Sequence, residues 1–123
     1  MKSTLPTDCG NSPRITLVGE FVRNWAGCEV DAVALRLADD AEWTFVGSAR
    51  HSGAAMSAEA CPARVPDQLV VTSIITHGRL ASCDGYLETD GGRTDFSHVF
   101  RFASTSKTAA IKELRTYLID TAD

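Results

Sequence analysis

The sequence predicts an α+β fold, in which N-terminal helices pack on one face of a curved antiparallel β-sheet. Apolar residues recur every three or four positions between Ile15 and Trp25, which indicates a helix. From Leu69 onward, runs rich in β-branched and aromatic residues alternate with turn sequences, which indicates strands. The chain has 123 residues, of which 44% are hydrophobic, and this suits one core. Residues 1–12 lack periodicity and predict a flexible arm, so we expect a single domain over residues 13–123.

Two helices are expected after the arm. Ser12 can cap the first helix, and Pro13 suits the first helical position because no intrahelical hydrogen bond is lost there. Gly27 is expected to end this helix. A second, short helix is expected from about Val30 to Ala38. The apolar stripe of the first helix contains Ile15, Leu17, Val18, Phe21, Val22 and Trp25.

The rest of the chain is expected to form strands around one weakly patterned segment. Alternation after Ala41 predicts a short strand that ends before Gly47. Residues 49–66 are rich in small side chains and predict either a mobile flap or a small third helix. The last segment, 110–119, has apolar residues at both helical and strand spacing. The four strands expected after residue 66 cover residues 69–77, 80–89, 93–103 and 110–119.

Charge and cysteine content exclude several classes of protein. The formal net charge of −4 and the pI of about 5.3 argue against nucleic acid and anionic membranes as partners. No apolar run is long enough to span a bilayer, and no secretory leader follows Lys2, so we expect a soluble, cytoplasmic protein. The four cysteines are widely spaced and lack a C-x-x-C pair, which predicts free thiols and no metal site. They are Cys9, Cys28, Cys61 and Cys83.

Several stretches resemble the NTF2-like superfamily, and in particular its SnoaL-like and ketosteroid-isomerase-like members. Residues 21–25 (FVRNW), 28–32 (CEVDA) and 37–43 (LADDAEW) resemble the opening helix of that family and the approach to its first strand. Residues 46–48 (VGS) resemble the loop that follows this strand. Residues 96–102 (FSHVFRF) and 111–119 (IKELRTYLI) resemble its last two strands, which favours a strand for the final segment.

The resemblance implies a cone-shaped fold with a mostly apolar pocket between the sheet and the helices. Three catalytic positions of ketosteroid isomerase fall on Phe45 for the base, Phe21 for the tyrosine and His98 for the acid. Phenylalanine can neither abstract a proton nor donate a hydrogen bond, so we do not expect steroid isomerisation by that mechanism.

His98 is the candidate acid or base of the expected pocket. It shares a strand face with Phe96 and Phe100, and an imidazole there can titrate near neutral pH. Asp84 is the candidate residue that orients it, if the register places the two strands suitably. The alternatives are that His98 is a core residue bonded to a neighbouring strand and that Asp84, beside Gly85, marks a bulge or an exposed edge.

The pocket is expected to be lined by aromatic side chains. Trp25 and Trp43 could bond a ligand oxygen through the indole N–H, although such tryptophans are often core residues. Arg50 and His51 could close over a ligand or could lie on a polar loop tip. The expected ligand-binding residues are Phe21, Trp25, Trp43, Phe45, Tyr86 and Phe100.

The function expected from these features is binding of a small hydrophobic or oxygenated molecule. No phosphate loop or dinucleotide motif is present in the sequence, so any reaction would be cofactor-free proton transfer, as in a cyclase, isomerase or dehydratase. The alternatives are a non-catalytic binding protein and a homodimeric interaction module. The sheet face expected to form the dimer contains Val99, Arg101, Leu114 and Leu118.

Overall fold

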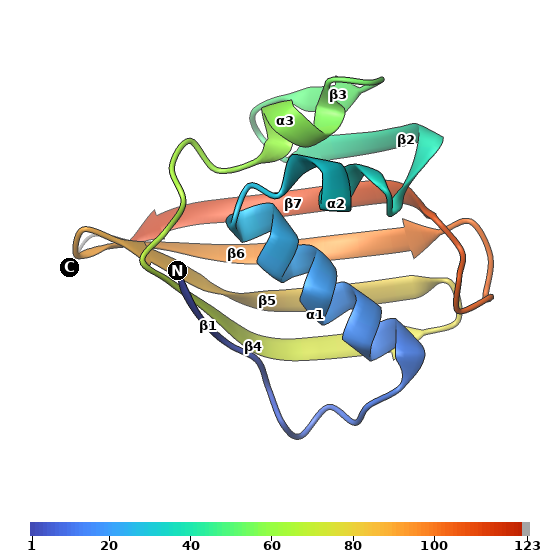
Figure 1. Cartoon of the computed structure of the whole chain (residues 1–123), viewed down its shortest axis with the longest axis horizontal. Helices are drawn as coiled ribbons and strands as arrows, with labels where there is room; N and C mark the ends of the chain where they lie inside the picture. Colours follow the sequence, from blue (N-terminus) through green and yellow to red (C-terminus); the bar gives the residue numbers. More distant parts are fainter. Residues whose placement is uncertain (122–123) are drawn as a thin grey trace.

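In the part of the chain that the structure describes, three helices lie on one face of an open seven-stranded sheet (Figure 1). The computed structural model describes residues 1–121. The predicted α+β fold is confirmed. The helices are α1 (Pro13–Ala26), α2 (Val30–Ala34) and α3 (Met56–Ala60). The strands are β1 (Lys2–Thr4), β2 (Leu37–Phe45), β3 (Arg50–Ser52), β4 (Gln68–His77), β5 (Leu80–Thr89), β6 (Gly92–Phe102) and β7 (Ile111–Thr121).

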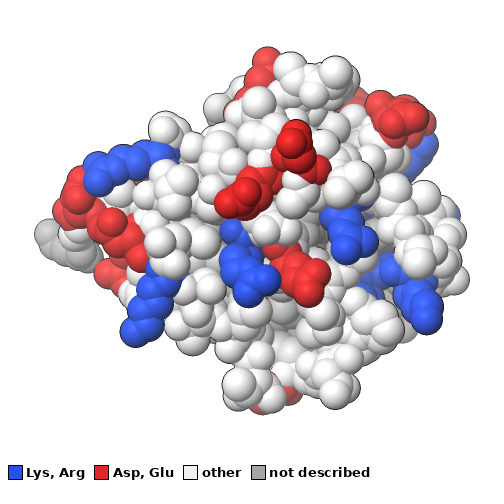
Figure 2. Space-filling view, viewed as in Figure 1, with Lys and Arg blue, Asp and Glu red and all other residues white. Residues whose placement is uncertain are grey.

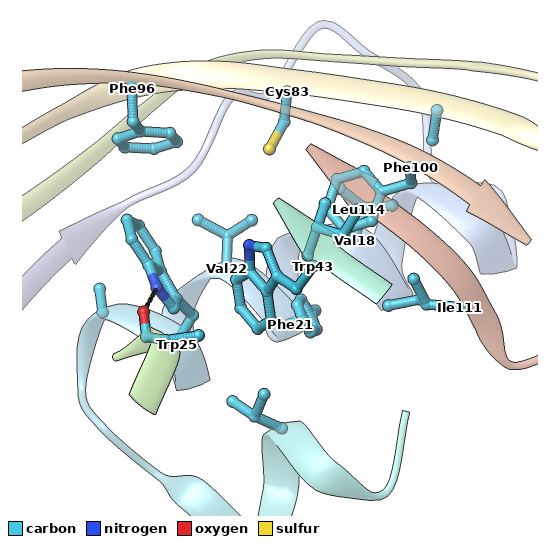
Figure 3. Packing of buried hydrophobic residues seen from close by; sticks show 14 of the residues in the cluster. Val18, Phe21, Val22, Trp25, Trp43, Cys83, Phe96, Phe100, Ile111 and Leu114 are labelled. Atoms are coloured by element: carbon cyan, nitrogen blue, oxygen red, sulfur yellow. Dashed lines mark hydrogen bonds between the residues drawn. The ribbon is translucent and has the colours of Figure 1, made fainter. Parts of the chain in front are cut away.

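Helix α1 begins and ends where the sequence predicts. The Ser12 hydroxyl accepts a hydrogen bond from the Ile15 amide at 3.3 Å, and Pro13 occupies the first turn. The helix ends at Ala26, and the Gly27 amide donates to the Arg23 carbonyl. Its apolar stripe packs on the sheet and forms one half of the core (Figure 3).

Part of the segment 1–12, which is expected to be a flexible arm, forms a strand. Residues 2–4 form β1, which pairs in parallel with β4. The Lys2 amide also donates to the Asp67 carbonyl at 2.9 Å. A three-residue strand is too short to show a recognisable periodicity. Its formation depends on pairing with a strand that is distant in sequence, which the local pattern does not reveal.

The second helix is shorter than predicted. It ends at Ala34, and Leu37 already begins β2, so the expected helix over Val30–Ala38 is wrong in its last four residues. The Ile111 amide donates to the Arg36 carbonyl at 2.8 Å, which joins this segment to β7. Pairing with a neighbouring strand therefore outweighs the local helical spacing.

The sheet is mixed and not fully antiparallel as predicted. Its strand order is β1-β4-β5-β6-β7-β2-β3. Strands β4 to β7 form an antiparallel meander, whereas β1 pairs in parallel with β4 and β2 pairs in parallel with β7. The final segment is a strand, as the family resemblance indicates.

The segment 49–66 contains both β3 and α3 and is closed by a disulfide. Cys61, just after α3, bonds to Cys28, just after α1, across 33 residues. The prediction of free thiols is therefore wrong for this pair, because the fold brings the C-terminal ends of two helices together. Cys9 and Cys83 are free, as predicted.

Charged side chains of both signs are interspersed over the helix-bearing face (Figure 2). Among the described residues, no helix has the length and hydropathy needed to cross a lipid bilayer. Within residues 1–121, no group of three or more His, Cys, Asp or Glu side chains is arranged to hold a metal ion.

Candidate functional site

His98 lies in the centre of the core and not on a cavity surface. Its side chain comes from β6, and the residue is 2% exposed. Its Nδ1 atom lies 2.7 Å from the Thr116 hydroxyl, which also accepts a hydrogen bond from the Trp43 indole at 2.8 Å. The Trp25 ring packs edge-on against the imidazole with a centroid distance of 4.5 Å. His98 is therefore a core residue that is bonded to the neighbouring strand.

Burial also removes the expected titration of His98 near neutral pH. Desolvation lowers the pKa of His98 to about 3, because the cationic form has lost its water. Within the described structure, the Nε2 atom is buried without a hydrogen-bond partner. An imidazole that stays neutral and has no contact with solvent is poorly suited to exchange protons with a ligand.

Asp84 does not orient His98, so this predicted pair is wrong. The register places Cys83 opposite His98 and Asp84 opposite Ser97, on the other face of the sheet. The exposed Asp84 carboxylate accepts a hydrogen bond from the Ser73 hydroxyl at 2.5 Å. The β4 register shifts between Val71 and Ser73, so the alternative interpretation of Asp84 as a mark of a bulge is the better one.

The expected aromatic residues divide into three groups. Phe21, Trp43 and Phe100 are buried in the core, with Phe21 packed against both of the other rings at centroid distances of 5.7 Å (Figure 3). Tyr86 lies on the outer face of the sheet, where the Arg93 guanidinium stacks on its ring at 3.8 Å. Trp25, which is itself largely buried, and Phe45 line the pocket described next.

The pocket that these two rings line lies between α3 and the ends of β2, β5, β6 and β7. It has a volume of about 360 Å³, which is enough for a small organic molecule. Apolar groups form much of its surface, and the polar groups come from five side chains and the backbone. The lining residues that the argument uses are Trp25, Phe45, His51, Glu59, Leu118 and Asp120.

A histidine and a carboxylate meet in this pocket. The His51 Nδ1 atom lies 3.4 Å from the Glu59 carboxylate, and the His51 side chain is 19% exposed. Pairing of β3 with β2 sets His51 opposite Trp43, so His51 faces the inner side of the sheet. The imidazole also packs edge-on against Phe45 at 5.6 Å. This pair has the composition that was predicted for His98 and Asp84, but other elements provide it.

Two links fix the α3 wall of the pocket to α1. The Trp25 indole donates a hydrogen bond to the Ala60 carbonyl at 2.8 Å, which Figure 3 marks with a dashed line. The Cys28–Cys61 disulfide lies next to it, and Cys61 itself lines the pocket. The position of Glu59 therefore depends on contacts outside its own short helix.

The opposite wall carries a second carboxylate. Asp120 lies near the end of β7 and accepts a hydrogen bond from the Thr94 hydroxyl of β6 at 2.8 Å. Arg50, which was expected to close over a ligand together with His51, points to the outer side of β3 and contacts Glu42 at 3.6 Å. Of that expected pair, His51 lines the pocket and Arg50 does not.

Sequence reasoning considered His51 but missed Glu59 and Asp120. The spacing of His51 and Glu59 carries no recognisable motif, because the residues lie on a three-residue strand and a five-residue helix. For Asp120, alternation with Leu118 along the last strand was an available signal. Alternation places Asp120 on the same face as Leu118, and the structure shows that this face is the inner one.

No model of a known protein family matches the sequence. No curated protein matches it either. Solved structures do match. A ketosteroid isomerase-like protein from Kribbella flavida has a TM-score of 0.72 and 17% identity, with 90% of this chain and 81% of that chain covered. An NTF2-like protein of unknown function from Burkholderia xenovorans has a TM-score of 0.69 and 16% identity, with coverages of 91% and 90%.

A third similar structure is an epoxide hydrolase of the LEH-like type from M. tuberculosis. Its TM-score is 0.60 at 19% identity, with 87% of this chain and 83% of that chain covered. Identities this low establish the fold and leave the chemistry of the site open. Helices packed on an open curved sheet, together with these matches, show that this chain has the fold of the NTF2-like superfamily.

Proposed function

We propose that the chain binds a small, largely apolar, oxygenated molecule in the pocket beside α3. The observation that supports this proposal is the pocket of about 360 Å³, with aromatic and aliphatic walls and a histidine–carboxylate pair at one side. Pockets of this size and composition commonly bury most of a small ligand and orient it through a few polar groups. As part of this proposal, we infer that the chain is a SnoaL-like domain, which is the type of domain that its sequence motifs resemble.

We further propose that His51 transfers protons to or from this molecule. The Glu59 carboxylate lies 3.4 Å from Nδ1 and favours a proton on that nitrogen, so that Nε2 is the atom that acts on the ligand. Glu59 then stabilises the imidazolium that forms when Nε2 takes a proton. The reactions that fit are cofactor-free isomerisation, dehydration or aldol-type cyclisation.

The test uses 4-phenylbutan-2-one as a probe, because its protons next to the carbonyl exchange with solvent when a base removes them. Binding is measured from the change in tryptophan fluorescence, since Trp25 lines the pocket. Exchange is measured by proton NMR in D₂O. We expect the unmodified chain to bind the probe saturably. We expect the His51→Gln substitution to slow the protein-dependent exchange by about 100-fold or more.

A matched control separates His51 from histidine content in general. His77 lies at the far end of β4, outside this pocket, so His77→Gln should leave both binding and exchange unchanged. Binding with no protein-dependent exchange would favour the non-catalytic binding protein instead. An exchange rate that His51→Gln leaves unaltered would contradict the catalytic part of the proposal.

A homodimer that forms through the outer face of the sheet is proposed as well. Ile75, Tyr117 and Ile119 are exposed on this face, and the two isoleucines are 63% and 64% exposed. Of the face expected from sequence, Val99 and Arg101 do lie on this outer side of β6, whereas Leu114 is buried and Leu118 lines the inner pocket. Leu114 and Leu118 pair with Phe100 and Phe96, whose side chains are buried on the inner face, so the expectation placed these two leucines on the wrong side of the sheet.

A further inference from the structure

We infer that the pocket beside α3 selects ligands with a positively charged or neutral polar end and rejects anionic ones. The ligand class that fits best is a small apolar amine, including amino ketones. This inference rests on the proposed ligand-binding function and names the chemistry of the ligand. It follows from two observations: carboxylates line the pocket, and no Lys or Arg is among the described residues that line it.

The charged side chains in the pocket wall are acidic. Glu59 enters from α3 and Asp120 enters from β7, so carboxylates stand on two different walls. No Lys or Arg is among the described residues that line this pocket. A carboxylate or phosphate ligand would therefore meet like charges without a compensating cation, which costs binding energy in a partly dry site.

Nearby arginines do not neutralise these two carboxylates. Arg64 is paired with Asp90 and is not among the described residues that line the pocket. Arg50 is paired with Glu42 on the outer side of β3. Each arginine thus has its own carboxylate partner, and the pocket keeps its negative charge.

Arg93 requires separate consideration, because it is next to Thr94 and borders a neighbouring groove with Asp120. Its guanidinium bonds to Asp95 at 3.0 Å and stacks on Tyr86, both on the outer face. Asp95 and Arg93 stabilise each other's charge, so the pKa of Asp95 is lowered. The Arg93 guanidinium therefore lies on the outer face of the sheet and does not neutralise Asp120.

The carboxylates of Asp120 and Glu59 each contact another described side chain through one oxygen. Thr94 donates to one oxygen of Asp120, which leaves the second oxygen as an acceptor. Glu59 contacts His51 through one oxygen and its side chain is 52% exposed. An ammonium group has three donors and can bond to such oxygens, while Trp25, Phe45 and Leu118 cover an apolar body.

Three probes of the same shape test the charge preference. They are 3-phenylpropylamine, 3-phenylpropan-1-ol and 3-phenylpropanoate, which are cationic, neutral and anionic at pH 7.5. Dissociation constants are measured for the full chain by tryptophan fluorescence and NMR titration in 50 mM NaCl. We expect the amine to bind at least about 10-fold more tightly than the propanoate, with the alcohol between them, and 500 mM NaCl to reduce this ratio.

Variants then assign the preference to the two carboxylates. Asp120→Asn and Glu59→Gln should each lower the amine-to-propanoate ratio by about 3-fold or more. Glu42→Gln is the matched control, because Glu42 is an exposed carboxylate outside the pocket, and it should leave the ratio unchanged. Circular dichroism spectra check that the variants are folded.

The outcomes separate this inference from the function on which it rests. If the alcohol binds but the propanoate binds as tightly as the amine, the charge preference is wrong and the proposed binding function stands. If the ratio is the same in Asp120→Asn, Glu59→Gln and the unmodified chain, the assigned residues are wrong. If none of the three probes binds, both the inference and the proposed function fail.

Discussion

At the scale of single residues, the buried imidazole of His98 makes stability depend on pH. The pKa of His98 is lowered to about 3 by desolvation, whereas an exposed histidine of the unfolded chain has a pKa near 6.5. Between these values the unfolded chain binds a proton that the folded chain does not. The contribution of His98 to the free energy of unfolding is therefore fully present above about pH 6.5, and it is lost as the pH falls toward 3.

A His98→Gln substitution should remove this pH dependence. The free energy of unfolding of the unmodified chain should fall by about 2 to 3 kcal/mol more than that of the variant between pH 7 and pH 4.5. The variant should also be less stable at pH 7, since the core loses ring contacts. Urea unfolding at several pH values measures both effects, and parallel pH profiles for the two proteins would contradict the prediction.

The placement of His98 shows what strand alternation can and cannot predict. Its shared face with Phe96 and Phe100 was predicted, and all three side chains are buried. Alternation gives the face of a strand but not the depth to which that face is covered. Here Trp25 and Trp43 pack against the imidazole and seal it from the pocket.

At the scale of elements, long periodic segments were predictable and short ones were not. Helix α1 and strands β4 to β6 agree with their patterns, because each buries one face along ten or more residues. The spacing in β7 fits both a helix and a strand, and the family resemblance is what indicates the strand. Strands β1 and β3 have three residues each, so their existence depends on a partner strand. The candidate His51–Glu59 pair lies on such short elements. For this reason the sequence analysis identified His51 as a candidate but did not identify Glu59.

The disulfide between α1 and α3 should stabilise this poorly patterned part of the fold. It closes a loop of 33 residues that contains α2, β2, β3 and α3. On the chain-entropy account, its loss should lower the free energy of unfolding by roughly 3 to 4 kcal/mol. A Cys28→Ser, Cys61→Ser double variant, compared with Cys9→Ser as the free-thiol control, should show this loss in urea unfolding.

Thiol titration gives an independent measure of the same bond. The denatured, unreduced chain should show two reactive thiols, from Cys9 and Cys83, and four after reduction. A reductant should destabilise the unmodified chain and leave the double variant unchanged. Four thiols without reduction, in protein purified under oxidising conditions, would contradict the bond.

At the scale of the whole molecule, the pocket is a product of topology. Its wall joins α1, β2, β3, α3, β5, β6 and β7, several of which are distant in sequence. The family resemblance predicted a pocket between the sheet and the helices, and two of its aromatic residues, Trp25 and Phe45, do line one. The carboxylates could not be assigned, because pocket position depends on how all seven elements meet.

The same topology favours association through the outer face of the sheet and not through its edges. The outermost strands, β1 and β3, have three residues each and so offer few free backbone groups to another chain. The outer face instead carries exposed apolar side chains, including Ile75 and Ile119. A symmetric dimer would bury these residues against the same face of a second copy.

Sedimentation velocity at 5 to 100 μM tests this dimer. An Ile75→Lys, Ile119→Lys double variant should shift the chain toward monomer, because burying unpaired ammonium groups at a symmetric contact is unfavourable. Leu35→Lys is the control, since Leu35 is 84% exposed and lies outside the sheet, just after α2. Because the ligand pocket opens on the inner side, the double variant should bind 3-phenylpropan-1-ol normally, and a monomeric unmodified chain at 100 μM would exclude the dimer.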